Sequence, residues 1–400
     1  MRRATSSASF FLGADAITKL LPFLLIPFLT LNLGAVEYAE LSRFYMYSAL
    51  FLAILNPGFD VYLNRMFIRE SPDQYRSNLL LSIVVCVLLA FLLLVLIYNA
   101  QLERVFIFSA LYAFLQSISL VVISYFQIRV MSRLYFFVNV VGATVSTCLT
   151  LYLFIYVEGF VEYRYESLLV GMLALIFTGV ILILCVDDGR WKITSCKISI
   201  VSISMFCMPL IVHNLSMYFR QYADKWIVDI SYESSVLSIF YLAFQLVSVV
   251  TILILALNKF LTREIMERIE NGMYWRLEKS VIVFFLILLM IIELVLYVLP
   301  NSVYNYFLGE EFSGINIFIM YMIPGVLSQI LYIFYSSPLF FYGETGKLSL
   351  ITLLSSVVSV IYLAVVSYCD AGLVFLAFSY LVSMMITIFL SRAYIKARYV

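Results

Sequence analysis

The chain consists almost entirely of apolar runs, which are separated by short polar segments. A helix needs roughly 20 mostly apolar residues to cross the hydrocarbon core of a bilayer, and on that basis we expect about 12 spans. They lie at residues 10–33, 44–62, 79–98, 105–126, 135–157, 167–186, 208–231, 236–258, 280–299, 315–336, 348–368 and 371–391. Because these runs are continuously apolar rather than alternating, they favour helices over a membrane β-barrel. The sequence therefore predicts an all-α polytopic membrane protein.

Composition excludes several other classes of protein. Hydrophobic residues make up 64% of the chain and charged residues 12%, whereas soluble domains are nearer 45–50% and 25%. The net charge of +1 offers no general attraction for nucleic acid. The six cysteines form no CxxC pair, and the chain has no HExxH, GxSxG or Walker A motif. We therefore expect no catalytic residue, no metal site and no cofactor.

The distribution of Lys and Arg predicts how the chain is oriented. If the N-terminus lies in the cytoplasm, most of these residues fall in cytoplasmic segments, and the opposite loops contain only Arg43, Arg104 and Arg164. Positively charged residues favour the cytoplasmic side of membrane proteins. The asymmetry therefore predicts an even number of spans, with both termini in the cytoplasm. The protein is expected in the cytoplasmic (inner) membrane of a bacterium.

The chain divides near its centre into two halves with a similar rhythm of spans. We expect a six-helix bundle at 1–190, a cytoplasmic linker at 191–207 and a second six-helix bundle at 208–400. Two six-span repeats run through the membrane in the same direction, which is typical of transporters. Their substrate site is expected near the middle of the membrane, between the halves.

Charged residues inside the spans are concentrated in the first helix of each half. Charges in a membrane span are costly and usually face a protein interior or a water-filled cavity. Here the cations Lys19, Arg220 and Lys225 could line such a cavity and hold a phosphate or pyrophosphate group. The planar guanidinium of Arg220 is suited to this because it can bind two oxygens at once.

The same spans contain acidic and amide groups that leave a second interpretation open. Asp15, Asp224 and Gln221 could also line the predicted cavity. Alternatively, oppositely charged residues four apart on a helix could simply neutralise each other. The pairs with this spacing are Asp15 with Lys19, Arg220 with Asp224, and Lys225 with Asp229.

Four titratable residues are candidates for coupling transport to a proton or sodium gradient. Asp15 and Asp224 lie in the charged helices, Glu293 lies within the span at 280–299, and His213 is the single histidine of the chain. His213 could relay a proton or pack between helices. Glu293 could bind the coupling ion or lie near the outer membrane surface.

Two further features bear on how these spans are built. Pro22 and Pro27 each remove a backbone hydrogen bond from the first span and predict a bend there, which could act as a gate or remain static. Tyrosines near span ends, among them Tyr38, Tyr165 and Tyr306, predict a belt at the membrane surface.

The second half contains two adjacent sequence stretches that resemble spans 7 and 8 of Wzx-type polysaccharide flippases. These stretches are MPLIVHNLSMYFRQYADKWIVDISY (208–232) and SIFYLAFQLVSVVTILILALNKFLTREI (238–265). The resemblance includes Pro209, the pair Asp224-Lys225, and Tyr241, Ala243 and Gln245. Lysine occupies a position where arginine is commoner in this family, which keeps the charge but weakens bidentate binding of phosphate.

Further stretches extend the resemblance over nearly the whole chain. They are LLPFLLIPFLTLNLGAVEYAELS (20–42), FLGEEFSGINIFIMYMIPG (307–325) and FFYGETGKLSLITLLSSVVSVIYL (340–363). The family belongs to the multidrug/oligosaccharidyl-lipid/polysaccharide exporter superfamily. The resemblance implies two six-helix bundles that form a V-shaped transporter.

The resemblance also implies a function. An undecaprenyl-pyrophosphate-linked oligosaccharide repeat unit would move from the inner to the outer leaflet by alternating access, for O-antigen or capsule assembly. The implied partners are this lipid-linked substrate, membrane lipid and the polysaccharide polymerase machinery. The alternatives are a drug/cation antiporter of the same superfamily and a membrane-embedded polysaccharide polymerase.

Overall fold

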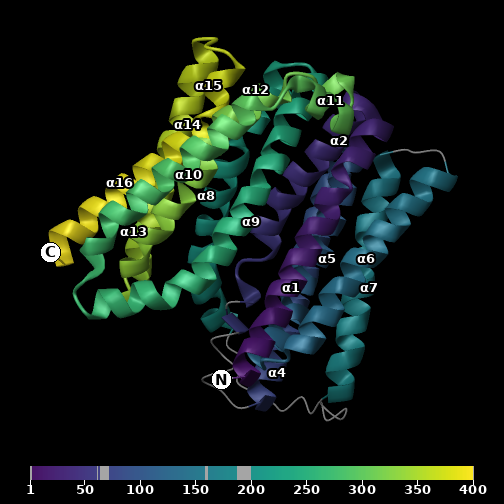
Figure 1. The fold of residues 1–400 in the computed structure, drawn as a ribbon. Helices are drawn as coiled ribbons and strands as arrows, with labels where there is room; N and C mark the ends of the chain where they lie inside the picture. Colours follow the sequence, from purple (N-terminus) through teal and green to yellow (C-terminus); the bar gives the residue numbers. More distant parts are fainter. Residues whose placement is uncertain (1, 61, 64–71, 158–160, 187–199, 400) are drawn as a thin grey trace. The chain divides into compact units, whose positions relative to one another are not determined.

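A computed structural model describes residues 2–60, 62–63, 72–157, 161–186 and 200–399, and this part of the chain is helical without any strand (Figure 1). Nine helices in it are long and apolar enough to cross a membrane, or up to ten if one bent pair is a single span. The prediction of an all-α multi-pass membrane protein is confirmed, and the number twelve stays a prediction. The helix at the predicted span 208–231 is not among the nine.

The backbone forms two compact units. Unit 1 contains Met1–Leu33 and Glu40–Leu215, and unit 2 contains Gly34–Ala39 and Ser216–Val400. The boundary at Leu215 lies inside α8 (Ile200–Ser231). Residues 191–199 of the predicted linker lie outside the described residues, and residues 200–207 begin α8. The predicted limits of the two bundles therefore remain a prediction.

Unit 1 is built from long helices that pack tightly. They are α1 (Arg2–Leu24), α2 (Ile26–Leu55), α4 (Pro72–Asn99), α5 (Arg104–Ile128), α6 (Ser132–Tyr156) and α7 (Val161–Val186). α6 packs against α7 and α1, and α5 packs against α7 and α4. Glycines permit the close approach of α6 and α7: a Cβ on Gly171 would lie 2.5 Å from Cβ of Ser146 and 2.8 Å from the carbonyl oxygen of Gly142.

The first helical segments bend and end where the sequence contains proline and glycine. A bend of 44° separates Gly13–Leu24 from Ile26–Leu55, next to Pro27, as the two prolines predict. Gly34 has a φ of 68° and interrupts α2, which separates the predicted spans 10–33 and 44–62. The second of these spans is shorter than expected. α2 ends at Leu55, and the side-chain oxygen of Asn56 then accepts a hydrogen bond from the backbone N–H of Phe59 at 3.1 Å.

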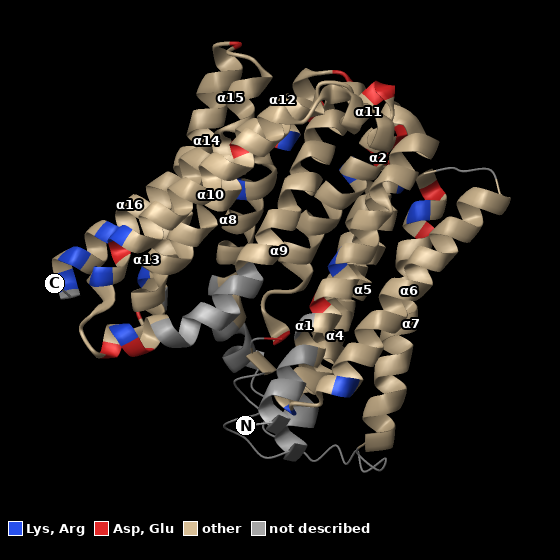
Figure 2. Cartoon of the chain, viewed as in Figure 1, with Lys and Arg blue, Asp and Glu red and all other residues tan. Residues whose placement is uncertain are grey.

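Unit 2 contains the remaining helices. They are α9 (Ser234–Glu270), η1 (Tyr274–Leu277), α10 (Glu278–Val298), α11 (Asn301–Leu308), η2 (Glu310–Phe312), α12 (Ile315–Leu327), α13 (Gln329–Phe341), α14 (Thr345–Tyr368), α15 (Leu373–Ala377) and α16 (Ser379–Tyr399). α9 packs against α12 and α13, and α16 packs against α12, α13 and α14. In each unit the charged residues gather mainly near the ends of the helices (Figure 2), as expected for a membrane protein.

Two stretches that are far apart in the sequence meet in unit 2. The backbone N–H of Ala35, just after the break at Gly34, donates a hydrogen bond to the Glu311 carboxylate at 2.6 Å. Beside it, Tyr38 packs edge-on against Phe312, with ring centroids 5.6 Å apart. A carboxylate at the start of a helix satisfies a free N–H and favours the helix dipole. Glu311 therefore caps the helical stretch that resumes after Gly34.

Candidate functional site

Arg220 is a buried cation on α8 in unit 2. Its side chain is 2% exposed. It donates a long hydrogen bond to the Thr387 hydroxyl at 3.5 Å, contacts the sulfur of Met217, and lies 5.9 Å from the centre of the Tyr332 ring. Its Nε is buried without a hydrogen-bond partner, and no carboxylate of the described residues pairs with it. A guanidinium with five donors is thus left with weak neutral contacts.

The helices around Arg220 supply aromatic and amide groups. Tyr332 lies on α13 and Tyr380 on α16. The amide of Gln329, also on α13, donates to the Tyr380 hydroxyl at 2.7 Å and to the Thr251 hydroxyl of α9 at 3.5 Å. These groups form a polar cluster in the interior of unit 2, and Arg220 carries its unneutralised positive charge.

Lys225 lies five positions further along α8 and has a different environment. It is 2% exposed, and its Nζ donates to both carboxylate oxygens of Asp224, at 2.9 and 3.0 Å. It also donates to the backbone carbonyl of Gln221 at 2.7 Å and lies 3.9 Å from the centre of the Phe244 ring. Lys225 is therefore a neutralised cation, held by a carboxylate and an aromatic ring.

This arrangement corrects the pairing expected from helical spacing. Asp224 pairs with its neighbour Lys225, so neither the Arg220–Asp224 pair nor the Lys225–Asp229 pair is formed. Residues adjacent in a helix normally point apart. Here the long lysine side chain turns back to the carboxylate, because both groups are buried and a buried charge needs a partner.

The charged residues of the first helix lie in unit 1. Asp15 on α1 accepts a hydrogen bond from the Tyr135 hydroxyl of α6 at 2.9 Å. The side chain of Lys19 is exposed. The structure thus ties Asp15 to the packing of α1 on α6, and leaves Lys19 on the surface of its unit.

The other candidates for ion coupling are dispersed. His213 lies on α8, half-buried, on the unit 1 side of the boundary at Leu215. Glu293 lies on α10, and one oxygen of its carboxylate is buried without a hydrogen-bond partner in the described part of the chain. Among the described residues, no three His, Cys, Asp or Glu side chains form a group that could hold a metal ion.

Sequence reasoning missed a second buried arginine. Arg164 was expected in an outer loop, but it lies in the first turn of α7 and is 1% exposed. It donates to the Thr150 hydroxyl at 2.8 Å, and to the Ser146 and Tyr45 hydroxyls at 3.5 Å each. A pattern in the sequence could have revealed this position, because Arg164 lies on the same face of α7 as Ser167 and Gly171, which contact α6.

Tyr165 and Tyr38 also differ from their expected places. Both were expected in a belt at the membrane surface, but they are 2% and 1% exposed. Tyr165 stacks on Phe44, with ring centroids 4.5 Å apart. Tyr306, by contrast, is exposed as a belt residue should be. A tyrosine near a span end can belong to the surface or to the packing between helices, and only the fold distinguishes the two.

Comparison with known proteins gives the family and the fold. A model of the polysaccharide biosynthesis protein family matches residues 5–261. Two proteins of Haemophilus influenzae are similar over most of their length. "Lsg locus putative protein 1" is 26% identical over 90% of both chains, and an "uncharacterized membrane protein" is 24% identical over 88% of this chain and 87% of its own.

Solved structures of MATE family transporters have the same fold. An inward-facing multidrug resistance MATE family transporter of the MOP superfamily superposes with a TM-score of 0.74 at 16% identity, over 96% of this chain and 95% of its own. An outward-facing one gives a TM-score of 0.66 at 15% identity, over 98% and 95%. The chain thus has the fold of these MATE family structures.

Proposed function

Because the chain belongs to the polysaccharide biosynthesis protein family, we propose that it is a flippase for a lipid-linked oligosaccharide. Its substrate is an undecaprenyl-pyrophosphate-linked repeat unit, which moves from the inner to the outer leaflet of the bacterial cytoplasmic membrane by alternating access. The product would enter O-antigen or capsule assembly, where a polysaccharide polymerase would use it. Both termini of the chain would lie in the cytoplasm.

The observation that carries this proposal is the unneutralised charge of Arg220. A buried cation without a counter-ion costs several kcal/mol, and here its described neighbours are hydroxyls, a thioether and an aromatic ring. A phosphate group would supply the missing negative charge and two oxygen acceptors for the guanidinium fork. Arg220 is therefore our candidate for the residue that binds the pyrophosphate.

The other candidate residues have supporting roles in this proposal. Lys19 is exposed on its unit and could attract the anionic carrier. Lys225, Asp224 and Gln221 are linked by hydrogen bonds and would shape the site rather than bind the phosphate directly. Asp15, Asp224, Glu293 and His213 remain candidates for coupling to a proton or sodium gradient.

The charges in unit 2 disfavour the alternative of a drug/cation antiporter. A cationic substrate at Arg220 would need a carboxylate there that is free to bind it, and the carboxylate of Asp224 on the same helix is already neutralised by Lys225. Arg220 would repel the substrate as well. The alternative of a polysaccharide polymerase needs acid–base residues, and no such cluster accompanies Arg220 among the residues named around it.

The proposal is tested in a bacterial strain that lacks the gene and carries a plasmid copy. We expect Arg220→Ala to abolish surface polysaccharide, with lipid-linked repeat units accumulating on the inner leaflet. Arg220→Lys should restore part of the export, because it keeps the charge but loses the bidentate fork. Surface glycan is measured by gel electrophoresis, and the leaflet of the repeat unit by its accessibility to an added glycosidase.

Arg276→Ala is the matched control, because Arg276 is an exposed arginine on η1. It should leave export unchanged at equal protein level in the membrane. Normal surface glycan in Arg220→Ala would contradict the anion site. Accumulation of single repeat units on the outer leaflet in the strain without the gene would identify a polymerase instead.

A further inference from the structure

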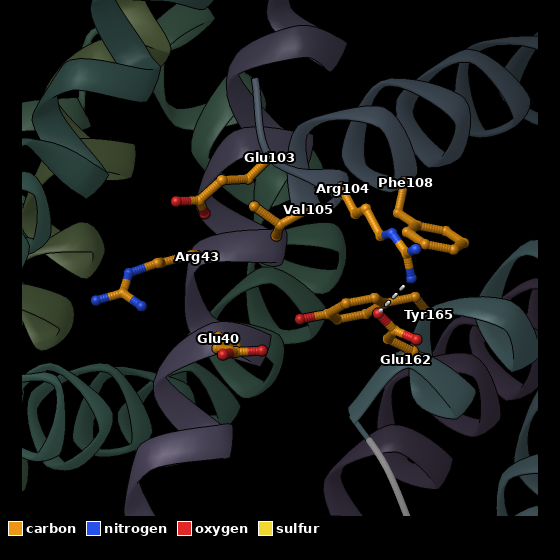
Figure 3. A pocket seen from close by; sticks show the side chains of 8 residues that line it. All are labelled: Glu40, Arg43, Glu103, Arg104, Val105, Phe108, Glu162 and Tyr165. Carbon is orange, nitrogen blue, oxygen red and sulfur yellow. Dashed lines mark ion pairs between the residues drawn. The ribbon is translucent and has the colours of Figure 1, made fainter. Parts of the chain in front are cut away.

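Unit 1 contains a pocket that is lined by none of the candidate residues for binding phosphate or coupling ions. Its cavity volume is about 180 Å³, and it lies between the middle of α2, the start of α5 and the start of α7 (Figure 3). Charged side chains from all three elements line it, together with one tyrosine: Glu40, Arg43, Glu103, Arg104, Glu162 and Tyr165. In Figure 3 the ring of Tyr165 lies beside the Arg104–Glu162 ion pair, whereas the side chain of Arg43 extends away from these residues.

Tyr165 gives this pocket a fixed aromatic ring and a polar group that could bind a ligand. Its ring is fixed by stacking on Phe44 and by a second ring, Phe108, at 5.6 Å. The residue is 2% exposed, yet its hydroxyl has no hydrogen-bond partner in the described part of the chain. A buried polar group without a partner is costly and is uncommon in native proteins. Tyr165 lines the pocket, and in Figure 3 the hydroxyl end of its ring is directed toward the side where Glu40 lies, so a ligand there could complete its hydrogen bonding.

The charges of the pocket indicate which ligand chemistry fits. Three carboxylates face two guanidiniums, which disfavours an anion such as phosphate. Arg104 and Glu162 form an ion pair at 3.6 Å, but their side chains are 82% and 48% exposed, so the pair is weak and can rearrange. Carboxylates accept hydrogen bonds, guanidiniums donate them, and a tyrosine hydroxyl does both. The pocket therefore suits a neutral ligand with many hydroxyl groups.

The size of the pocket limits that ligand to one ring. Sites for drug-sized ligands have volumes of roughly 300–1,000 Å³, and this cavity is smaller. The rings of Phe108 and Tyr165 line it and could cover the apolar C–H face of a sugar, while the charged groups bind its hydroxyls. We infer that the pocket between α2, α5 and α7 is a subsite for a single neutral saccharide ring.

This inference rests on the proposed function, because it assigns the sugar part of the substrate to a place on unit 1. The pocket lies where α5 and α7 begin, and its residues Arg43 and Arg104 belong to the loops predicted to lie outside the cytoplasm. The subsite would therefore hold a sugar of the repeat unit at the outer side of the membrane. Arg220 and this subsite are distinct sites for the two chemically different parts of one substrate.

The test is binding of free monosaccharides to the purified full-length protein in lipid nanodiscs. Glucose, galactose and N-acetylglucosamine serve as neutral probes, and glucuronate and inorganic phosphate as anionic ones, with saturation-transfer NMR as the readout. We expect at least one neutral probe to bind at millimolar concentration. Tyr165→Phe should lower the affinity for that probe roughly fivefold, the typical effect of one lost hydrogen bond. This variant keeps the ring and removes a hydroxyl that has no partner, so the fold should be unaffected.

A second variant and a matched control complete the experiment. Glu103→Gln should also weaken binding, whereas Glu166→Gln should not, because Glu166 is an exposed acid of the same helix as Tyr165 and does not line the pocket. The inference is overturned if no neutral probe binds, if an anionic probe binds more tightly, or if neither variant changes the affinity. The assay needs neither lipid carrier nor export. Monosaccharide binding can therefore be absent while the flippase proposal holds, and it can be present while the export test of Arg220 fails.

Discussion

Removing the charge of each buried cation of α8 should change the thermal stability of the protein in opposite directions. Arg220 and Lys225 are five positions apart and equally buried, at 2% exposed. Lys225 has a carboxylate partner and Arg220 has none among the described residues. Replacing each by methionine removes the charge and keeps much of the apolar volume. The pair of variants therefore separates the cost of burying a lone charge from the benefit of a buried ion pair.

The magnitudes follow from the contacts of each residue. Arg220→Met loses one long hydrogen bond to Thr387 and a ring contact with Tyr332, and it also removes an uncompensated buried charge. Replacing even a complete buried ion pair by apolar groups is often neutral or stabilising by about 1–4 kcal/mol, and a buried charge without a carboxylate partner has no pair energy to lose. Lys225→Met leaves the Asp224 carboxylate buried without its 2.9 Å partner. Removing one member of a buried pair costs about 3–5 kcal/mol.

The assay is thermal unfolding of both variants in detergent, followed by tryptophan fluorescence. We expect the Tm of Arg220→Met to equal or exceed that of the unaltered protein, although export is lost. The Tm of Lys225→Met should fall by roughly 6 °C or more, from about 2–4 °C per kcal/mol for a unit of this size. A comparable fall in Arg220→Met would show that Arg220 supports the fold, and would refute its role as an unneutralised cation kept for substrate.

Two further predictions concern the packing of each unit. Gly171→Ala should destabilise unit 1 by about 1–3 kcal/mol, because the new methyl group would lie 2.5 Å from Cβ of Ser146. The control is Gly346→Ala, whose new methyl group would meet no atom within 4 Å. Its Tm should equal or exceed that of the unaltered protein. Glu311→Ala should remove the hydrogen bond that caps the helix at Ala35 and lower stability by about 0.5–2 kcal/mol. Hydrogen exchange of the backbone amides after Gly34 should then become faster. Unchanged exchange would show that Glu311 does not stabilise the start of this helix.

The positions of the helices were largely predictable from the sequence. A lipid bilayer requires that each backbone N–H and C=O be paired inside its own helix, so a long apolar run is almost sufficient to define a helix. The predicted span 105–126, for example, corresponds to α5 at Arg104–Ile128. Glycine and proline also predicted where the helices bend or break. The bend lies next to Pro27, which cannot donate a backbone hydrogen bond, and the break lies at Gly34, which has a positive φ.

The partners of the charged residues were harder to predict. Helical spacing suggested that Arg220 pairs with Asp224, but the carboxylate pairs with Lys225 instead. Spacing defines which side chains can meet within one helix, whereas burial decides which charges need to meet. Arg164 was interpreted as a loop residue because it lies near a span end, and its hydroxyl partners come from α2 and α6. A local sequence window can show that Arg164 lies on the packed face of α7, but it cannot show which residues of other helices are its partners.

The sequence by itself determined that this protein crosses the membrane many times as helices, because the cost of unpaired backbone groups in lipid leaves no other arrangement for such apolar runs. It also indicated that Arg220, Asp224 and Lys225 are charged residues inside the protein, although it missed Arg164. Only the tertiary structure decided that Lys225 is neutralised, and that among the described residues neither Arg220 has a carboxylate partner nor the hydroxyl of Tyr165, a residue that lines a pocket, a hydrogen-bond partner. The physical reason is that the free energy of a buried polar group depends on its partners, and these come from helices that are distant in the chain.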